Sequence, residues 1–203
     1  MPIFSTAYLP PILYVATAAK YGTIAIERYE TFPKQTFRNR AAIATASGVE
    51  ILSVPVIRTN GNHTTTNDIL VSYHEPWHIR HWRAIVSAYN TSPFFLYYRD
   101  PLEEILNTRF NRLIDLNDAL MIYIFKSLKI DCEVHYTEDY LPEDPSNPTF
   151  RTSLTNKKAL QTAPLLPSYY QVFEQKNGFI PNLSIIDLIF NLGPEAKGYL
   201  CCI

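Results

Sequence analysis

The chain has 203 residues, which is enough for one domain whose core needs no disulfide or metal to hold it together. Its 47% apolar content, with charges of both signs interspersed, excludes a disordered chain. The 18 Lys and Arg residues against 19 Asp and Glu give a net charge of −1, which argues against nucleic acid as a partner. We therefore expect residues 1–203 to form a single domain.

The cysteines and the apolar stretches of the sequence indicate the cellular compartment of the protein. Cys132, Cys201 and Cys202 are odd in number and two are adjacent, so they form no disulfide framework, which favours a reducing compartment. The N-terminus lacks the basic region and apolar run of a secretory signal. No stretch approaches the ~20 apolar residues of a membrane span. These features predict a cytoplasmic protein that is not attached to a membrane.

The first elements form a strand–turn–helix–strand opening. Residues 3–9 read as a short strand that Pro10-Pro11 ends, and proline is tolerated in the first turn of the helix that follows. That helix is predicted over 12–21, with Gly22 as its stop, and a second strand over 23–27. The spacing predicts a compact βαβ unit.

Short strands are expected in the next part of the chain. Residues 41–45 and 51–57 can pair as a hairpin, because Gly48 supplies the turn. Residues 59–67 contain no apolar side chain and read as a loop. A further strand is predicted over 69–73.

Three helices and a strand follow. Residues 76–90 show helical periodicity, and Asp100-Pro101 marks the start of a second helix. A third helix is predicted over 116–128, after Asp115, and it is apolar nearly all round, as in a central helix. Alternation over 130–136 predicts a half-exposed strand.

The C-terminal part begins with a proline-rich stretch. Residues 141–168 contain five prolines and little periodicity, and we expect a long extended connection there. A helix over 185–192, closed by Gly193-Pro194, follows it. The predicted fold class is α/β, with a mixed, partly parallel sheet flanked by helices.

The densest polar stretch is Lys34-Gln35-Thr36-Phe37-Arg38-Asn39-Arg40, with three cations and two side-chain amides. Guanidinium groups suit phosphate or carboxylate, although an exposed, solvated cluster fits the composition equally well. The turn Ala7-Tyr8-Leu9-Pro10 lies at the natural ligand edge of an open α/β sheet, and the cationic stretch could fold over it. Lys34, Arg38, Asn39 and Arg40, with Tyr8, are therefore candidate ligand-binding residues.

Candidate proton carriers are fewer. His78 and His81 are three apart on one predicted helix, but no cysteine or carboxylate stands beside them at ligand spacing, so we predict no metal site and keep His81 as a candidate catalytic residue. Asp187 and Asn191 lie four apart on an otherwise apolar helix. A buried carboxylate needs a partner, so Asp187 either forms a structural ion pair with an arginine or serves as a catalytic acid–base. We keep Asp187 as a candidate catalytic residue and Asn191 as a candidate ligand-binding residue. There is no Walker, Rossmann or nucleophile-elbow motif, and no cofactor is expected.

Several motifs together resemble the WbqC-like protein family over most of the chain except about 140–168. They are Tyr8-Leu9-Pro10, Lys34-Gln35-x-x-Arg38-Asn39-Arg40, Leu52-Ser53-Val54-Pro55-Val56, Trp77 with His81-Trp82, Ala88-Tyr89-Asn90-x-Ser92-Pro93-Phe94-Phe95-x-Tyr97-Tyr98, and Pro181-Asn182-Leu183-Ser184-Ile185-Ile186-Asp187-x-x-Phe190-Asn191-x-Gly193-Pro194.

The resemblance implies an intracellular bacterial protein, often encoded among genes for surface-polysaccharide or O-antigen assembly. Transfer of an acyl or aminoacyl group to an amino sugar would fit that setting. Many members carry His-Gln-Pro just before the equivalent of Tyr8, where this chain has Phe4-Ser5-Thr6, so no role of that histidine carries over. The family's opening is also similar to that of nucleotidyltransferases, which bind nucleotide at this turn.

Two hypotheses follow. The first is a transferase acting on a sugar or nucleotide-sugar precursor, with Arg38 and Arg40 holding a phosphate or carboxylate and His81 or Asp187 moving protons. The second is a non-catalytic ligand-binding or assembly protein of the same pathway. The sequence leaves homo-oligomer formation open.

Overall fold

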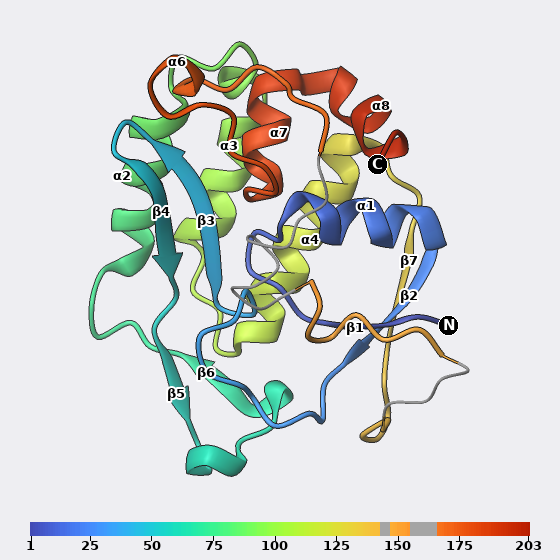
Figure 1. Cartoon of the computed structure of the whole chain (residues 1–203). Helices are drawn as coiled ribbons and strands as arrows, with labels where there is room; N and C mark the ends of the chain where they lie inside the picture. The colour runs from blue at the N-terminus through green and yellow to red at the C-terminus, as the bar shows by residue number, and fades with distance from the viewer. Residues whose placement is uncertain (143–146, 155–165) are drawn as a thin grey trace.

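The fold comes from a computed structural model that describes residues 1–142, 147–154 and 166–203 (Figure 1). It opens with β1 (Ile3–Ser5), α1 (Ile12–Tyr21) and β2 (Thr23–Glu27), and β1 pairs with β2 in parallel. Gly22 ends α1 because its φ of 67° is left-handed, and its N–H donates to the Ala18 carbonyl at 3.1 Å. The predicted βαβ opening is confirmed.

The strands form one parallel sheet and two antiparallel pairs. The strand β7 (Glu133–Tyr136) joins the other side of β2 in parallel, which gives the order β1-β2-β7. The hairpin consists of β3 (Arg40–Thr45) and β4 (Gly48–Ser53), and β5 (Val56–Arg58) pairs with β6 (Ile69–Val71). With helices around these strands, the mixed and partly parallel α/β fold is as predicted.

Two element boundaries differ from the prediction because of prolines. The expected strand 51–57 is split, since Pro55 has no N–H to continue a ladder and β5 turns to pair with β6 instead. The helix α3 runs over Phe95–Asn107 and contains Pro101, so the start predicted at Asp100 is wrong. Pro101 is exposed on this helix, where water can hydrate the carbonyl left without its N–H.

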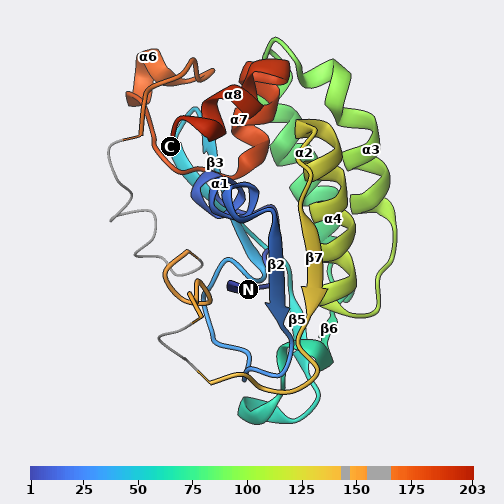
Figure 2. The ribbon, with the colours of Figure 1, turned by 90° about the vertical axis from the view of Figure 1, so that its right-hand side faces the viewer.

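The remaining helices cover the strands. They are α2 (Trp77–Tyr89), α4 (Leu113–Leu128), α6 (Glu174–Asn177), α7 (Ile185–Leu192) and α8 (Ala196–Cys201), with short 3-10 turns at Gly61–His63, Thr66–Asp68 and Gly193–Glu195. Turning the view by 90° shows α4 beside β7 and α3 on its outer side (Figure 2). All of α7 except Leu192 is buried, so this helix lies at the centre of the core.

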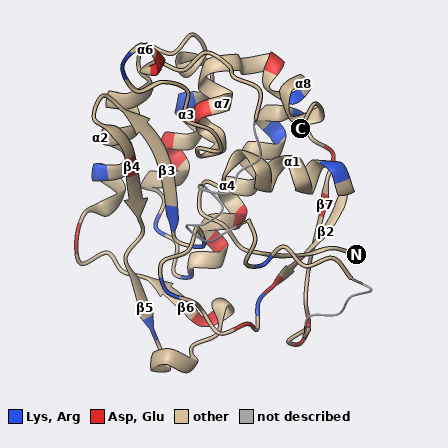
Figure 3. Cartoon of the chain, viewed as in Figure 1, with Lys and Arg blue, Asp and Glu red and all other residues tan. Residues whose placement is uncertain are grey.

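In the described part of the chain, no helix combines the length and apolarity needed to cross a bilayer. Basic and acidic residues are interspersed along the ribbon (Figure 3). Residues 143–146 and 155–165 of the predicted proline-rich connection lie outside the described residues.

Candidate functional site

A pocket of about 460 Å³ opens beside the carboxyl end of β2. In open α/β sheets this edge is where ligands bind. The lining residues come from the loop after β2, from the stretch leading into β3 and from the segment after β7, namely Tyr29, Glu30, Thr31, Pro33, Arg38, Tyr140, Arg151 and Thr152.

An ion pair forms the polar wall of this pocket. The Arg38 Nε and Nη2 atoms lie 2.8 Å and 2.7 Å from Glu30 Oε1, and Nη2 also donates to the Arg151 carbonyl at 3.0 Å. The Arg38 side chain is only 1% exposed. Burial raises the pKa of Glu30, and the positive charge of Arg38 opposes that rise. The pair therefore places a fixed cation and a carboxyl group of raised proton affinity at one wall.

The pocket lining combines charged side chains with exposed aromatic rings. Among the described residues, the lining brings together the guanidinium groups of Arg38 and Arg151 and the carboxyl group of Glu30. The Arg151 guanidinium lies over the ring of Tyr140, 5.4 Å from its centroid. Tyr140 is 55% exposed and Tyr29 is 36% exposed, so both phenols are available to a ligand.

A buried carboxylate holds the loops of this edge together. Glu27, the last residue of β2, is fully buried and accepts hydrogen bonds from the Tyr29 and Leu141 N–H groups at 2.7 and 2.9 Å. It also accepts from the Thr137 hydroxyl at 3.1 Å. The loop after β2 is thereby tied to the segment after β7, and both contribute to the pocket wall.

The start of α1, which we expected at the ligand edge, is occupied by the protein itself. The Ile12 N–H donates to the Leu183 carbonyl at 3.0 Å and the Leu13 N–H to Asn182 Oδ1 at 2.9 Å. A helix N-terminus binds an anion through such N–H groups, and here they are already used. The cationic stretch does reach this turn, since the Tyr8 N–H donates to the Phe37 carbonyl at 2.9 Å. The pocket is consequently formed by the loop after β2 and not by the helix start.

Tyr8 and His81 form a separate buried pair. Tyr8 is fully buried, His81 is 6% exposed, and the Tyr8 hydroxyl lies 2.9 Å from His81 Nδ1. Burial lowers the pKa of His81 to about 4, and a hydrogen bond with the Ser53 backbone opposes this. Trp77 packs edge-on against the imidazole with ring centroids 5.1 Å apart. A neutral His81 whose Nδ1 accepts a hydrogen bond from the Tyr8 hydroxyl is satisfied within the core, and neither residue lines the pocket.

Asp187 is the centre of a third cluster. Its carboxylate accepts hydrogen bonds from the hydroxyls of Tyr89 and Tyr169 and, at 3.2 Å, from the Gln171 amide. Among the described residues its partners are these phenols and this amide, so the arginine suggested by the sequence is not the partner. Burial raises the pKa of Asp187 to about 6, although the hydrogen bonds lower it. Asn191 donates to the Asp187 carbonyl at 2.8 Å along α7.

The other predicted ligand residues have different environments. Lys34 is exposed, and the Asn39 amide donates to the Val54 carbonyl at 2.9 Å, which closes the end of the β3–β4 hairpin. Arg40 begins β3 opposite Ser53, and its buried Nε has no hydrogen-bond partner among the described residues. Of all the predicted site residues, Arg38 is the one that lines the pocket.

The sequence reasoning missed Glu30, Arg151 and the two tyrosines of the pocket. A signal for Glu30 was present, because Glu27 and Glu30 directly follow a predicted strand at the carboxyl edge of a parallel sheet. Arg151 lies in the proline-rich stretch and is 113 residues from Arg38, so no local pattern could connect them.

The comparisons with known proteins agree with the motifs. The model of the WbqC-like protein family matches residues 6–162 and 156–199. The chain belongs to the WbqC-like protein family. An uncharacterised protein of Mycobacterium tuberculosis (strain ATCC 25618 / H37Rv) is 28% identical over 222 residues, which cover 98% of this chain and 96% of that protein. No solved structure gives a significant match.

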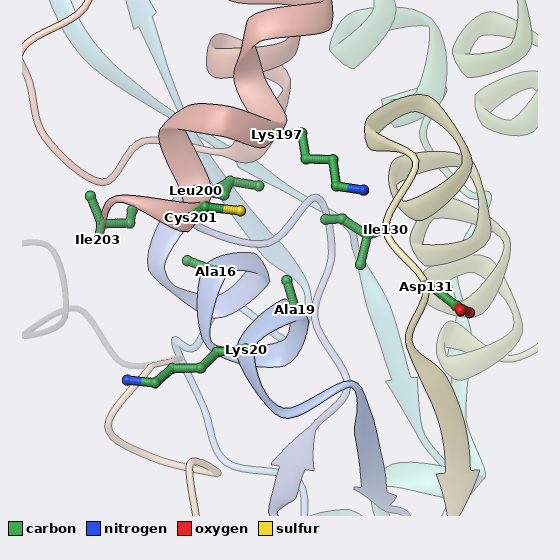
Figure 4. Close-up of a pocket in the computed structure, with 9 residues that line it drawn as sticks. All are labelled: Ala16, Ala19, Lys20, Ile130, Asp131, Lys197, Leu200, Cys201 and Ile203. Carbon is green, nitrogen blue, oxygen red and sulfur yellow. The ribbon is translucent and has the colours of Figure 1, made fainter.

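A second pocket of this WbqC-like protein, of about 470 Å³, lies between α1, α8 and the segment before β7 (Figure 4). Its walls are largely aliphatic, and the Lys197 side chain extends across it toward Ile130. The Lys197 Nζ donates to the Lys129 carbonyl at 2.7 Å. Figure 4 shows the polar ends of Lys20 and Asp131 pointing away from its centre. Because its polar groups do not converge, we place the candidate site at the Glu30–Arg38 pocket.

Within the part of the chain that the structure describes, no three His, Cys, Asp or Glu side chains lie close enough to hold a metal ion. The described lining of the Glu30–Arg38 pocket offers two guanidinium groups, two phenols, two hydroxyls and a carboxyl group.

Proposed function

We propose that this protein binds a phosphate- or carboxylate-bearing sugar precursor, a nucleotide sugar being the leading candidate, in the Glu30–Arg38 pocket and transfers a group to or from it. The observation that supports this is a buried guanidinium with a paired carboxyl group at the carboxyl edge of a parallel sheet. Membership of the WbqC-like family supports the assembly of surface polysaccharide as the setting, in the cytoplasm, where such precursors are handled.

Each part of the pocket has a task in this proposal. Arg38 and Arg151 attract the anionic group, and Thr31 and Thr152, which also line the pocket, supply hydroxyls that can donate hydrogen bonds to it. Tyr29 and Tyr140 offer faces for a sugar or base. The phosphate or carboxylate is thereby held at the Arg38 wall, while the remainder of the ligand lies along the tyrosines.

Glu30 is the residue that we expect to move a proton. A carboxyl group with a raised pKa is a better base than an ordinary one, and in a transfer to an amine or hydroxyl it would accept the proton that the nucleophile loses. This role replaces the one that the sequence suggested for His81 and Asp187, since both lie in hydrogen-bonded clusters away from the pocket lining.

A second candidate function is ligand binding without catalysis. The distribution of the candidate residues favours a binding protein, because Arg38 lines the pocket whereas His81 and Asp187 do not. Incubating the protein with a bound nucleotide sugar and a panel of acyl and aminoacyl donors separates the two functions. Mass spectrometry should detect a modified sugar that depends on Glu30 if the protein is a transferase, and an unchanged ligand if it is a binding protein.

The binding proposal is tested by a thermal-shift screen followed by calorimetry. UDP-N-acetylglucosamine, dTDP-glucose and pyrophosphate serve as probes. The double variant Glu30→Gln, Arg38→Gln keeps the net charge and should lose binding. The matched control is Glu75→Gln, Arg80→Gln, which removes an ion pair whose side chains are 62% and 60% exposed outside the pocket. If no probe binds, or if both double variants bind as the parent does, the proposal is wrong.

A further inference from the structure

The outer surface of α4 carries an apolar side chain that the described residues leave largely exposed. Most of α4 is buried, but Ile122, at its middle, is 69% exposed. Leu96 and Tyr97 on the neighbouring α3 are 72% and 80% exposed. A group of exposed apolar side chains on two packed helices is typical of an interaction surface.

Ile122 stands as a ridge between two hollows. One, of about 400 Å³, is lined by Met121 and Phe125 of α4 and by Val134 of β7. The other, of about 330 Å³, is lined by Tyr98 of α3 and Tyr123 of α4. Ile122 belongs to the wall of both. A ridge with a hollow on each side has the shape that a copy of the same surface can fill, with each Ile122 entering a hollow of the other molecule.

The charges along this face are arranged symmetrically about Ile122. Asp118 lies four residues before it and Lys126 four residues after it, which places the three on one side of the helix. Asp115 is already paired with Arg112 of its own chain, and Lys129 lies past the end of α4, so Asp118 and Lys126 are the charges that flank Ile122. Acidic residues early and basic residues late also suit the helix dipole, so these charges alone do not indicate an interface. They indicate one because they flank the exposed apolar ridge at Ile122.

We infer that α4 is the contact surface of a homodimer with two-fold symmetry. In a two-fold pair with antiparallel α4 helices that cross at Ile122, Asp118 of each copy faces Lys126 of the other. A second copy is the occupant that this pattern fits, because a two-fold interface must be complementary to itself. The contact lies on α3, α4 and β7, and its existence does not depend on the ligand proposed above.

Sedimentation velocity from about 1 to 100 µM tests this inference. The wild-type chain should form dimers, and Ile122→Glu should raise the dimer dissociation constant about a hundredfold or more, because each dimer loses two central apolar contacts and gains two buried charges. The control is Ile57→Glu, which changes an isoleucine that is 50% exposed on β5. Since both residues are exposed, circular dichroism should show the parental fold in both variants.

Charge reversal gives a second, independent measurement. Lys126→Glu should weaken the dimer about tenfold, since it places like charges across the interface twice. Lys176→Glu, an exposed lysine on α6, should leave it unchanged. A wild-type chain that stays monomeric throughout the range overturns the inference. So does a dimer that survives Ile122→Glu or loses as much affinity with the controls.

Discussion

Replacing Asp187 by asparagine should remove the part of the pH dependence of the unfolding free energy that this carboxyl group causes. The carboxylate is fully buried among Tyr89, Tyr169 and Gln171, and burial raises its pKa from 3.8 to about 6. Between these values the folded chain holds a proton that the unfolded chain has released. Stability is therefore lost as the pH rises from about 4 to 6. The difference corresponds to about 3 kcal/mol, at ~1.4 kcal/mol for each pH unit.

The variant Asp187→Asn keeps the shape of the side chain but cannot ionise. Its amide makes one of the three hydrogen bonds less well, which costs about 1 kcal/mol. At pH 7.5 the variant should therefore be about 2 kcal/mol more stable than the wild type, and at pH 4 about 1 kcal/mol less stable. Other titrating groups, such as Asp118, whose pKa burial also raises to about 6, cancel in this comparison.

Urea unfolding followed by the fluorescence of Trp77 and Trp82, at several pH values between 4 and 7.5, measures both stabilities. A stability difference that does not change with pH would refute the reasoning. A wild type that gains on the variant as the pH rises would also refute it, because it would mean that the hydrogen bonds hold the carboxylate charged and its pKa low.

Two further changes test other parts of the structure. Gly193→Ala should destabilise the fold by about 3 kcal/mol in urea unfolding, because φ there is 53° and a Cβ would lie 2.5 Å from the Phe94 ring. Gly22→Ala should cost only about 1 kcal/mol, because φ is 67° but no atom lies within 4 Å of the added Cβ. Equal losses would contradict the packing argument. For His81→Asn, the sign is opposite to that of Asp187. The pKa of His81 is lowered from 6.5 to about 4, so the wild type should lose about 3 kcal/mol relative to the variant as the pH falls through that range, and a flat difference would disprove the neutral, Tyr8-bonded histidine.

The sequence predicted those elements whose boundaries depend on neighbouring residues. Both α1 and α7 begin and end where predicted, because a proline or a polar residue starts them and a glycine with a left-handed φ follows them. The prediction failed at Pro101, where a local start signal is overridden by the packing of Phe95 and Leu102 into the core.

The partners of the polar side chains could not be predicted in the same way. Asp187 meets Tyr89 from 98 residues away and Tyr8 meets His81 from 73 residues away. Such pairs exist only because distant elements are packed together, so the sequence indicated that Asp187 needs a partner but not which one. For Arg38, the local charge pattern singled out the residue, and the packing of the loop after β2 places it in the wall of a pocket.

The most direct test of the proposed site observes the arginines themselves by ¹H–¹⁵N NMR. The Nε–H of Arg38 is bonded to Glu30 and should give a protected side-chain signal. Titration with UDP-N-acetylglucosamine or pyrophosphate should shift the Nε signals of Arg38 and Arg151 and leave that of Arg80 unchanged. If ligand binds while those two signals stay fixed, the Glu30–Arg38 pocket is not the binding site.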